Sequence, residues 1–265
     1  MGSTDLNKPT KRQLKTFSGL RRVVATLRGP EGCKWDRVQT HASLRPYLVE
    51  ETAEVLAALD AENPIALAEE LGDLLIEVLL HVQIAEENGD FTMEDVIYGI
   101  GDKLVRRHPH VFGDAVAETP EAVMTQWDEL KRAERVGESA LFGIPETLPA
   151  LAYAQAIQRR AAKAGFAFDS KDQAWEALEE EIDELKLAKT AEEQRDELGD
   201  VLFATANVAR WYDADAEDAL WLTARRFSRN FRRLEGIVDD RGVDLSETAV
   251  AEKMALWEEA KAQTG

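Results

Sequence analysis

Apolar residues recur at steps of three and four along most of this chain, which is the spacing of one face of an α-helix. The clearest runs are Leu44, Leu48, Thr52, Val55, Leu56 and Leu59, followed by Leu67, Leu71, Leu74, Leu75, Val78, Leu79 and Val82. Alternating runs of β-branched residues, which would indicate half-buried strands, are nearly absent. The pattern therefore predicts an all-α protein.

Turn-forming residues divide the chain into separate helices. Asn63-Pro64 separates the two apolar runs, and Asn88-Gly89-Asp90 ends the second of them. Thr92, followed three residues later by Asp95, is typical of a helix N-cap. Further breaks are predicted at His108-Pro109-His110, Gly113, Thr119-Pro120 and the stretch 137–149, which contains Gly and Pro.

The two halves of the chain resemble each other. The tetrapeptide Glu-Leu-Gly-Asp occurs at 70–73 and again at 197–200, and Glu50-Glu51 has a collinear match in Glu180-Glu181. Chance similarity between helices does not produce several matches in one order, so we interpret them as a tandem duplication of one helical unit. The predicted organisation is a first domain at 10–137, a linker at 138–148 and a second domain at 149–265.

Composition limits the possible partners. The chain has 32 Lys and Arg against 51 Asp and Glu, a net charge of −19 at pH 7, which argues against a nucleic-acid partner. Its single cysteine, Cys33, excludes an internal disulfide framework and fits a reducing compartment. The longest apolar run contains Asp73, Glu77 and His81 and is too short and too charged to span a bilayer. With no recognisable signal peptide, we expect a soluble, cytoplasmic protein.

Some of the acidic residues form a pattern that a random acidic surface does not explain. Glu51 and Glu54 are three residues apart and share one helix face, and Glu70 and Asp73 do the same on the next helix. A short turn makes these helices antiparallel neighbours, so four carboxylates converge among apolar residues and repel one another. A hard divalent cation removes this cost, and all-oxygen ligands favour Mg²⁺ or Mn²⁺ over Zn²⁺.

The second half repeats the four acids as Glu181, Glu184, Glu197 and Asp200. In both halves a glycine, Gly72 or Gly199, precedes the last acid inside the helix, at a cost of about 1 kcal/mol relative to alanine. Close approach of another helix or of a ligand would explain it.

Taken together, these motifs resemble the all-α NTP pyrophosphohydrolase superfamily and, more closely, its two-domain MazG family. The pattern is Glu-Glu-x-x-Glu, a gap, and Glu-x-x-Asp. The stretches that narrow the resemblance to MazG are Gly32-Cys33-Lys34-Trp35-Asp36, Tyr47-Leu48-Val49-Glu50-Glu51, Arg106-Arg107-His108-Pro109-His110-Val111-Phe112 and Leu202-Phe203-Ala204-Thr205-Ala206-Asn207. The resemblance covers roughly residues 15–262.

The resemblance implies Mg²⁺-dependent hydrolysis of nucleoside triphosphates, ribo or deoxy and including modified or oxidised ones, to the monophosphate and pyrophosphate. It also implies tandem MazG-type helical bundles packed as a homodimer. Glu50 and Glu180 match the family's leading glutamate, which orients water or holds a further Mg²⁺. By the same resemblance the metal ligands are Glu51, Glu54, Glu70 and Asp73 in the first domain and Glu181, Glu184, Glu197 and Asp200 in the second; Glu51, Glu54 and Glu181 are also catalytic candidates.

The family binds the triphosphate with a Lys and an Arg four residues later. The first domain has both, as Lys103 and Arg107, whereas the second has Arg226 and Asn230 in their places. Lysine and arginine are not interchangeable at a shaped site, so the first domain is expected to have the more complete nucleotide site, although in well-known family members the second domain is catalytic. The family's Trp-x-x-x-Lys, for base stacking and phosphate, is present as Trp127 with Lys131 and as Trp257 with Lys261.

Two alternatives remain open from the sequence. One is a hydrolase of narrow specificity, similar to a dUTPase. The other is a helical dimerisation or regulatory scaffold in which the carboxylates bind metal only structurally. The sequence selects neither the base nor the subunit that supplies each nucleotide-binding residue.

Overall fold

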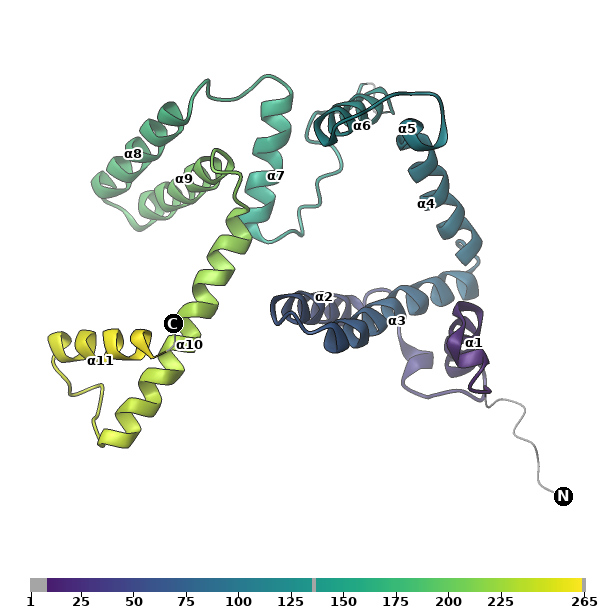
Figure 1. Cartoon of the computed structure of the whole chain (residues 1–265), viewed down its shortest axis with the longest axis horizontal. Helices are drawn as coiled ribbons and strands as arrows, with labels where there is room; N and C mark the ends of the chain where they lie inside the picture. The colour runs from purple at the N-terminus through teal and green to yellow at the C-terminus, as the bar shows by residue number, and fades with distance from the viewer. Residues whose placement is uncertain (1–8, 135–136, 264–265) are drawn as a thin grey trace. The chain divides into compact units, whose positions relative to one another are not determined.

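The computed structural model describes residues 9–134 and 137–263, and its regular elements there are all helical. The chain divides into two compact units, with the boundary between Glu134 and Arg135. We call the part before this boundary the first unit and the part after it the second unit (Figure 1). No helix in the described residues is long and apolar enough to cross a membrane.

The first unit is built around a long helical hairpin. It contains two short 3₁₀ turns, η1 (Gln13–Lys15) and η2 (Asp36–Val38), and six helices: α1 (Phe17–Arg28), α2 (Arg45–Asp60), α3 (Pro64–Asn88), α4 (Met93–Arg107), α5 (Pro109–Phe112) and α6 (Pro120–Glu134). Helices α2 and α3 pack along each other, and α1 packs on the C-terminal part of α3 (Figure 1). The buried residues of the core are Val24, Leu44, Leu79, Leu80, Val82, Ile84 and Met93.

The second unit repeats the hairpin. Its helices are α7 (Ala150–Lys163), α8 (Lys171–Leu187), α9 (Ala191–Arg210), α10 (Ala216–Arg241) and α11 (Val250–Ala262). Helices α8 and α9 pack along each other as α2 and α3 do, α7 covers α9, and α10 packs against α11. One core cluster contains Ala174, Leu178 and Val208, and a second contains Leu234, Ile237, Val238, Leu256 and Ala260.

The predicted helix breaks are confirmed. Asn63 caps α3 by accepting hydrogen bonds from the backbone N–H groups of Ile65 and Ala66, and α3 ends before Gly89, whose φ is +77°. Thr92 and Asp95 form a reciprocal capping box at the start of α4. The stretch 137–149 contains no helix. These breaks fix the register of the helices that carry the carboxylates.

Both helix-interior glycines lack a neighbour within the described chain. A Cβ atom built on Gly72 or Gly199 would meet no atom within 4 Å. Within each unit, tight packing among the described residues therefore does not explain either glycine.

Candidate functional site

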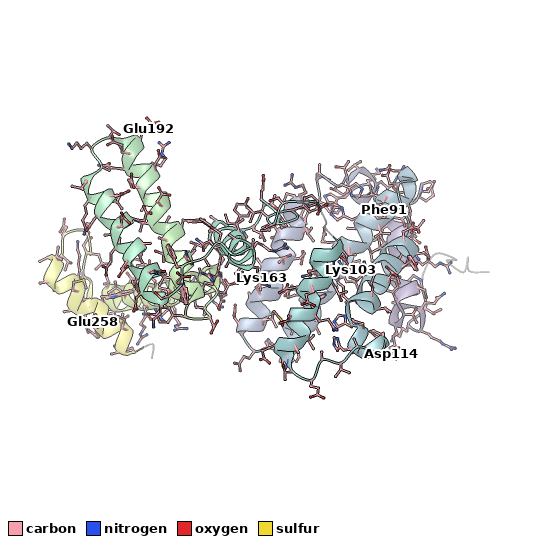
Figure 2. All side chains as sticks on the ribbon, turned by 90° about the horizontal axis from the view of Figure 1, so that it is seen from above. Phe91, Lys103, Asp114, Lys163, Glu192 and Glu258 are labelled. Carbon is pink, nitrogen blue, oxygen red and sulfur yellow. The ribbon has the colours of Figure 1, made fainter. Side chains whose placement is uncertain are left out.

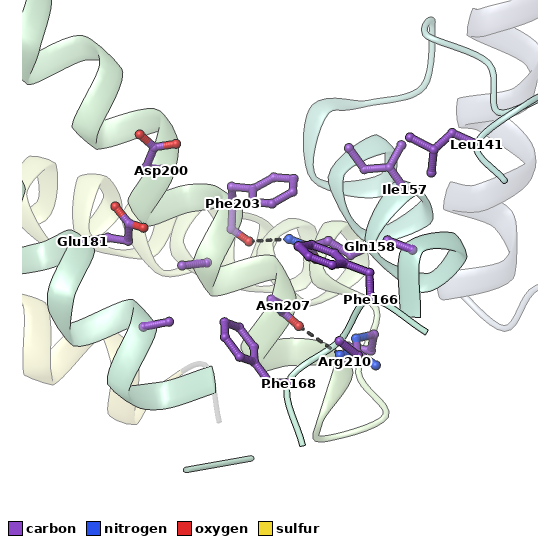
Figure 3. Close-up of a pocket in the computed structure, with 14 residues that line it drawn as sticks. Leu141, Ile157, Gln158, Phe166, Phe168, Glu181, Asp200, Phe203, Asn207 and Arg210 are labelled. Carbon is purple, nitrogen blue, oxygen red and sulfur yellow. Dashed lines mark hydrogen bonds between the residues drawn. The ribbon is translucent and has the colours of Figure 1, made fainter. Parts of the chain in front are cut away.

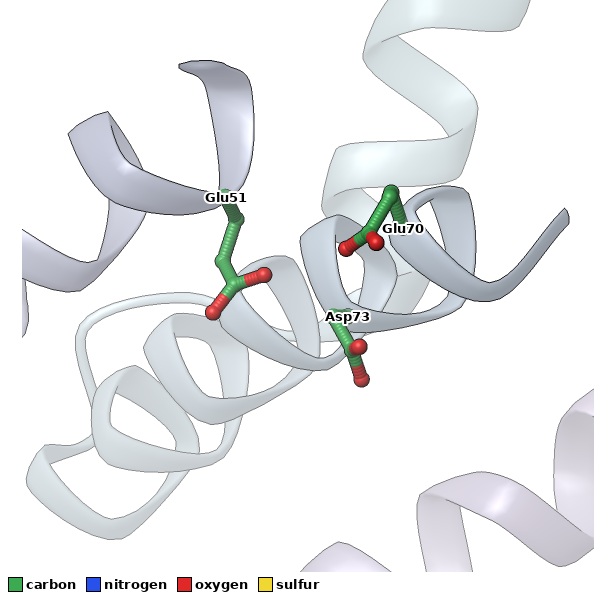
Figure 4. Close-up of side chains that lie close together, drawn as sticks. All are labelled: Glu51, Glu70 and Asp73. Atoms are coloured by element: carbon green, nitrogen blue, oxygen red, sulfur yellow. The ribbon is translucent and has the colours of Figure 1, made fainter. Parts of the chain in front are cut away.

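The first unit brings its acidic residues together across the α2–α3 hairpin. Glu51 on α2 and Glu70 and Asp73 on α3 each have a carboxylate oxygen within 4.8 Å of the others (Figure 4). Glu51 and Glu70 are half-buried, and Asp73 is exposed. Glu54 lies outside this group of three but close enough that its charge affects both Glu51 and Glu70. We call these four residues the first cluster.

The second unit has the equivalent group across the α8–α9 hairpin. Glu181 and Glu184 on α8 and Glu197 on α9 each have an oxygen within 4.8 Å of the others. Asp200 lies outside this group of three but repels both Glu181 and Glu197. Thr190 and Glu193 form the capping box that starts α9, which fixes the position of Glu197 two turns later. These four residues are the second cluster.

Burial and mutual repulsion together oppose ionisation in both clusters. Partial burial, followed by repulsion from Glu54, Asp73 and Glu50, raises the pKa of Glu51 above its ordinary value. The pKa of Glu181 is raised in the same way, by partial burial and then by Asp200 and its other acidic neighbours. No lysine or arginine contributes to either shift, so neither carboxylate has a cationic partner among the described residues.

The donor set fits a hard divalent cation. Each cluster offers only carboxylate oxygens, which are the ligands that Mg²⁺ and Mn²⁺ prefer. In addition, Glu51 Oε2 is buried and has no hydrogen-bond partner in the described part of the chain. A buried acceptor without a donor is costly, and a cation at this position would satisfy it.

A cavity of about 590 Å³ lies beside the second cluster. Glu181 and Asp200 line one end of it, and three phenylalanines, Phe166, Phe168 and Phe203, line much of the rest (Figure 3). At the far end, Arg210 donates a hydrogen bond to Asn207 Oδ1 over 3.2 Å. The combination of an apolar wall, a few polar groups and a carboxylate end is typical of a small-molecule site.

Lys103 and Arg107, the two basic residues expected to bind the triphosphate in the first unit, lie on α4. Lys103 is exposed on this helix (Figure 2), whereas Arg107 is half-buried and its Nη2 donates to Glu134 Oε2 over 2.6 Å. On α6, the ammonium of Lys131 lies 4.4 Å from the centre of the Trp127 ring. The indole N–H of Trp127 is buried without a partner in the described residues. Of these two residues, Arg107 is thus already bound by Glu134.

The corresponding residues of the second unit are placed differently. Arg226 is exposed on α10, and Asn230, where the family has arginine, is buried with only 8% exposure. Trp257 packs against the α10–α11 core, with its ring 5.1 Å from that of Phe227, and Lys261 pairs with Glu258. In this arrangement Trp257 is half-buried against the core of the second unit.

Sequence reasoning missed two features. One is the apolar part of the cavity on α7, α9 and the loop before α8; the sequence predicts roles for Glu181 and Asp200 at its edge, but none for its phenylalanines, Asn207 or Arg210. The other is Glu77, an acid that is buried on α3. A charged residue inside an apolar helical run was the available signal for Glu77; the cavity depends on tertiary packing and had no such signal.

Comparisons with known proteins agree with the resemblance drawn from the motifs. The model of the MazG nucleotide pyrophosphohydrolase domain matches residues 39–112. The chain is 42% identical over 252 residues to the nucleoside triphosphate pyrophosphohydrolase/pyrophosphatase MazG of Thermotoga maritima, covering 92% of this chain and 95% of that protein. It is 41% identical over 250 residues to the nucleoside triphosphate pyrophosphohydrolase of Escherichia coli K12, covering 91% and 95%.

The raised pKa values give a prediction about pH. A carboxyl group whose pKa is raised on folding contributes stability at low pH and loses it as the pH rises through the folded-state value. The metal-free protein should therefore lose stability above that value, and Mg²⁺ should restore it, because a cation binds only the deprotonated groups. We expect Mg²⁺ to raise the melting temperature more at pH 7.5 than at pH 5, as measured by circular dichroism.

The control for this experiment is a chain with both clusters neutralised, Glu51→Gln/Glu70→Gln/Glu181→Gln/Glu197→Gln. Its melting temperature should respond little to Mg²⁺ at either pH. An equal Mg²⁺ effect at both pH values, or the same effect in the neutralised chain, would contradict the assignment.

Proposed function

This chain belongs to the MazG family and is a nucleoside triphosphate pyrophosphohydrolase, and from that premise we propose how its two units divide the work. The reaction adds water to a nucleoside triphosphate and releases the monophosphate and pyrophosphate. We propose that it depends on Mg²⁺, with Mn²⁺ as a substitute. The observation that supports the proposed hydrolysis most strongly is the cavity bordered by the second cluster, where a nucleotide could bind next to carboxylates.

The two clusters are proposed to hold the cation. Once bound, Mg²⁺ supplies charge neutralisation at the phosphates and polarises phosphorus. The chain's own contribution is to hold the carboxylates in place. Glu50 and Glu180, each next to a cluster glutamate, are proposed to orient the attacking water or accept its proton. The acidic site can receive an anionic substrate because the nucleotide enters as its Mg²⁺ complex.

We propose that hydrolysis takes place in the second unit. A nucleoside needs an enclosing apolar volume, and the cavity beside Glu181 and Asp200 provides one. The base would lie among the phenylalanines, with Asn207 and Arg210 facing its polar atoms or those of the sugar. Arg210 also provides positive charge in a unit that lacks the family's Lys–Arg pair, a contribution that a comparison of the α10 positions alone overlooks.

The remaining nucleotide contacts stay proposals for both units. They are Lys103, Arg107, Trp127 and Lys131 in the first unit and Arg226, Trp257 and Lys261 in the second. The ion pair between Arg107 and Glu134 must open before Arg107 can bind a triphosphate, which is a further reason to favour the second unit.

We also propose that the active form is a cytoplasmic homodimer. Large apolar side chains are exposed on α2 and α3, among them Leu48, Leu56, Leu71 and Leu75. A second copy of the chain would cover such a surface, and it would explain why no neighbour approaches Gly72. Modified or oxidised nucleotides are included in the proposed substrate range. A purely structural scaffold is the competing function, and its signature would be metal binding without pyrophosphate release.

Substitution of one cluster at a time tests the division of work. Glu181→Gln/Glu184→Gln should lower kcat for pyrophosphate release by at least about 100-fold, because several kcal/mol of charge stabilisation are lost. Glu51→Gln/Glu54→Gln should retain most of the activity. Pyrophosphate release from a panel of nucleoside triphosphates, with and without Mg²⁺, is the measurement.

The matched control is Glu176→Gln/Glu179→Gln, two exposed acids on the same helix α8, which should behave like the unmodified chain. Loss of activity in the first-cluster variant, with activity retained in the second-cluster variant, would assign hydrolysis to the first unit instead.

Substitution of Arg210 tests whether the cavity binds the substrate. Arg210→Met keeps the length of the side chain but removes its charge and hydrogen bonds, so KM should rise about tenfold, since a hydrogen bond to a charged group is worth roughly 1.5–3 kcal/mol. Arg195→Met, at an exposed position on the same helix, should leave KM unchanged. Equal KM values for the two variants would rule out a substrate contact by Arg210.

A further inference from the structure

Glu77 is a buried acid that the proposed reaction does not use. It lies on α3 one helical turn after Asp73, so the two side chains share a helix face. Only 6% of Glu77 is exposed, and its Oε2 atom has no hydrogen-bond partner among the described residues. Acids are rarely buried unless they are paired, so this side chain needs an explanation.

The charge that acts on Glu77 comes from another acid. Burial and then repulsion from Glu51 raise the pKa of Glu77. Glu51 Oε2 is itself buried and unpartnered in the described part of the chain. Glu51 is thus close enough to interact both with Glu70 and Asp73 of the first cluster and with Glu77.

His81, one turn further along α3, does not supply the missing positive charge. Its pKa is lowered by burial and by His41, whose Nδ1 lies 2.7 Å from Nδ1 of His81. Both effects disfavour the charged imidazolium form of His81. Two buried carboxylate oxygens, one from Glu51 and one from Glu77, thus have no hydrogen-bond donor among the described residues.

We propose that Glu51 bridges two divalent cations in the first unit, and that Glu77 is a ligand of the inner one. This inference rests on the proposed metal-binding role of the first cluster. A carboxylate has two oxygens that can bind different ions, and paired divalent ions linked in this way are a common arrangement in phosphate-processing enzymes. The outer ion would be held by Glu51, Glu70 and Asp73, and the inner ion by Glu51 and Glu77.

The second unit lacks this inner site. The repeated Glu-Leu-Gly-Asp aligns Glu70 with Glu197 and Asp73 with Asp200, and the same alignment places Ala204 at the position of Glu77. Ala204 is one of the residues that line the cavity. The duplicated units have therefore diverged at this position, one keeping a buried ligand and the other opening space for a substrate.

The test counts Mn²⁺ ions in the full-length chain. The starting variant removes the second cluster, so that only the first unit binds Mn²⁺. It carries the substitutions Glu181→Gln/Glu184→Gln/Glu197→Gln. In this background we expect two Mn²⁺ ions per chain by calorimetry, with the broadened electron paramagnetic resonance signal of a spin-coupled pair. Adding Glu77→Gln, which preserves the shape of the side chain, should leave one ion with the resolved signal of isolated Mn²⁺.

Glu69→Gln is the charge-matched control, because Glu69 is an exposed acid on the same helix; it should retain two coupled ions. Circular dichroism establishes that each variant is folded. A count that Glu77→Gln leaves unchanged would overturn the inference while the metal role of the cluster stands, and so would the loss of both ions from a folded variant. Absence of any bound Mn²⁺ in the background chain would overturn the proposed metal role and the inference with it.

Discussion

Repulsion between half-buried carboxylates is the constraint on which this structure depends. Each helical hairpin brings oxygens of three acids within 4.8 Å of one another and a fourth acid close by, and no described lysine or arginine contributes to the pKa shifts of Glu51 and Glu181. Such an arrangement costs stability unless a cation is present, because burial and like charge both oppose ionisation. We propose that the ligand that offsets this cost is a Mg²⁺-bound nucleotide, because it fits both the charge of the clusters and the family.

Duplication gave the two units the same carboxylates but not the same surroundings. In the first unit the helix that carries Glu70 and Asp73 continues with the buried Glu77, and the phosphate-type Arg107 pairs with Glu134. In the second unit the equivalent helix, α9, has Ala204 at the position of Glu77, and Ala204 lines a cavity that ends at Arg210. These differences are the basis of the proposed division of work, in which the second unit encloses the nucleoside.

Much of the fold could be predicted from local signals. The caps Asn63 and Thr92 and the break at Gly89 act through hydrogen bonds within a few residues, so the sequence alone located the helix ends. The spacing of the acids predicted four converging carboxylates in each hairpin; three of the four come together in each, and Glu54 and Asp200 lie outside these groups. The cavity could not be predicted, because Phe166 and Phe203 come together only through packing of α7, α8 and α9. The burial of Asn230 and the packing of Trp257 against Phe227 also depend on tertiary packing, so the sequence could not predict them.

The most direct measurement is a crystal structure of the protein grown with Mn²⁺, with data collected at the manganese absorption edge. The account predicts anomalous density at both clusters, within about 2.2 Å of carboxylate oxygens of Glu51, Glu70 and Asp73 and of Glu181, Glu184 and Glu197, since divalent ions of this size bind oxygen at roughly that distance. Well-ordered clusters without anomalous density, or density only at unrelated surface acids, would contradict it.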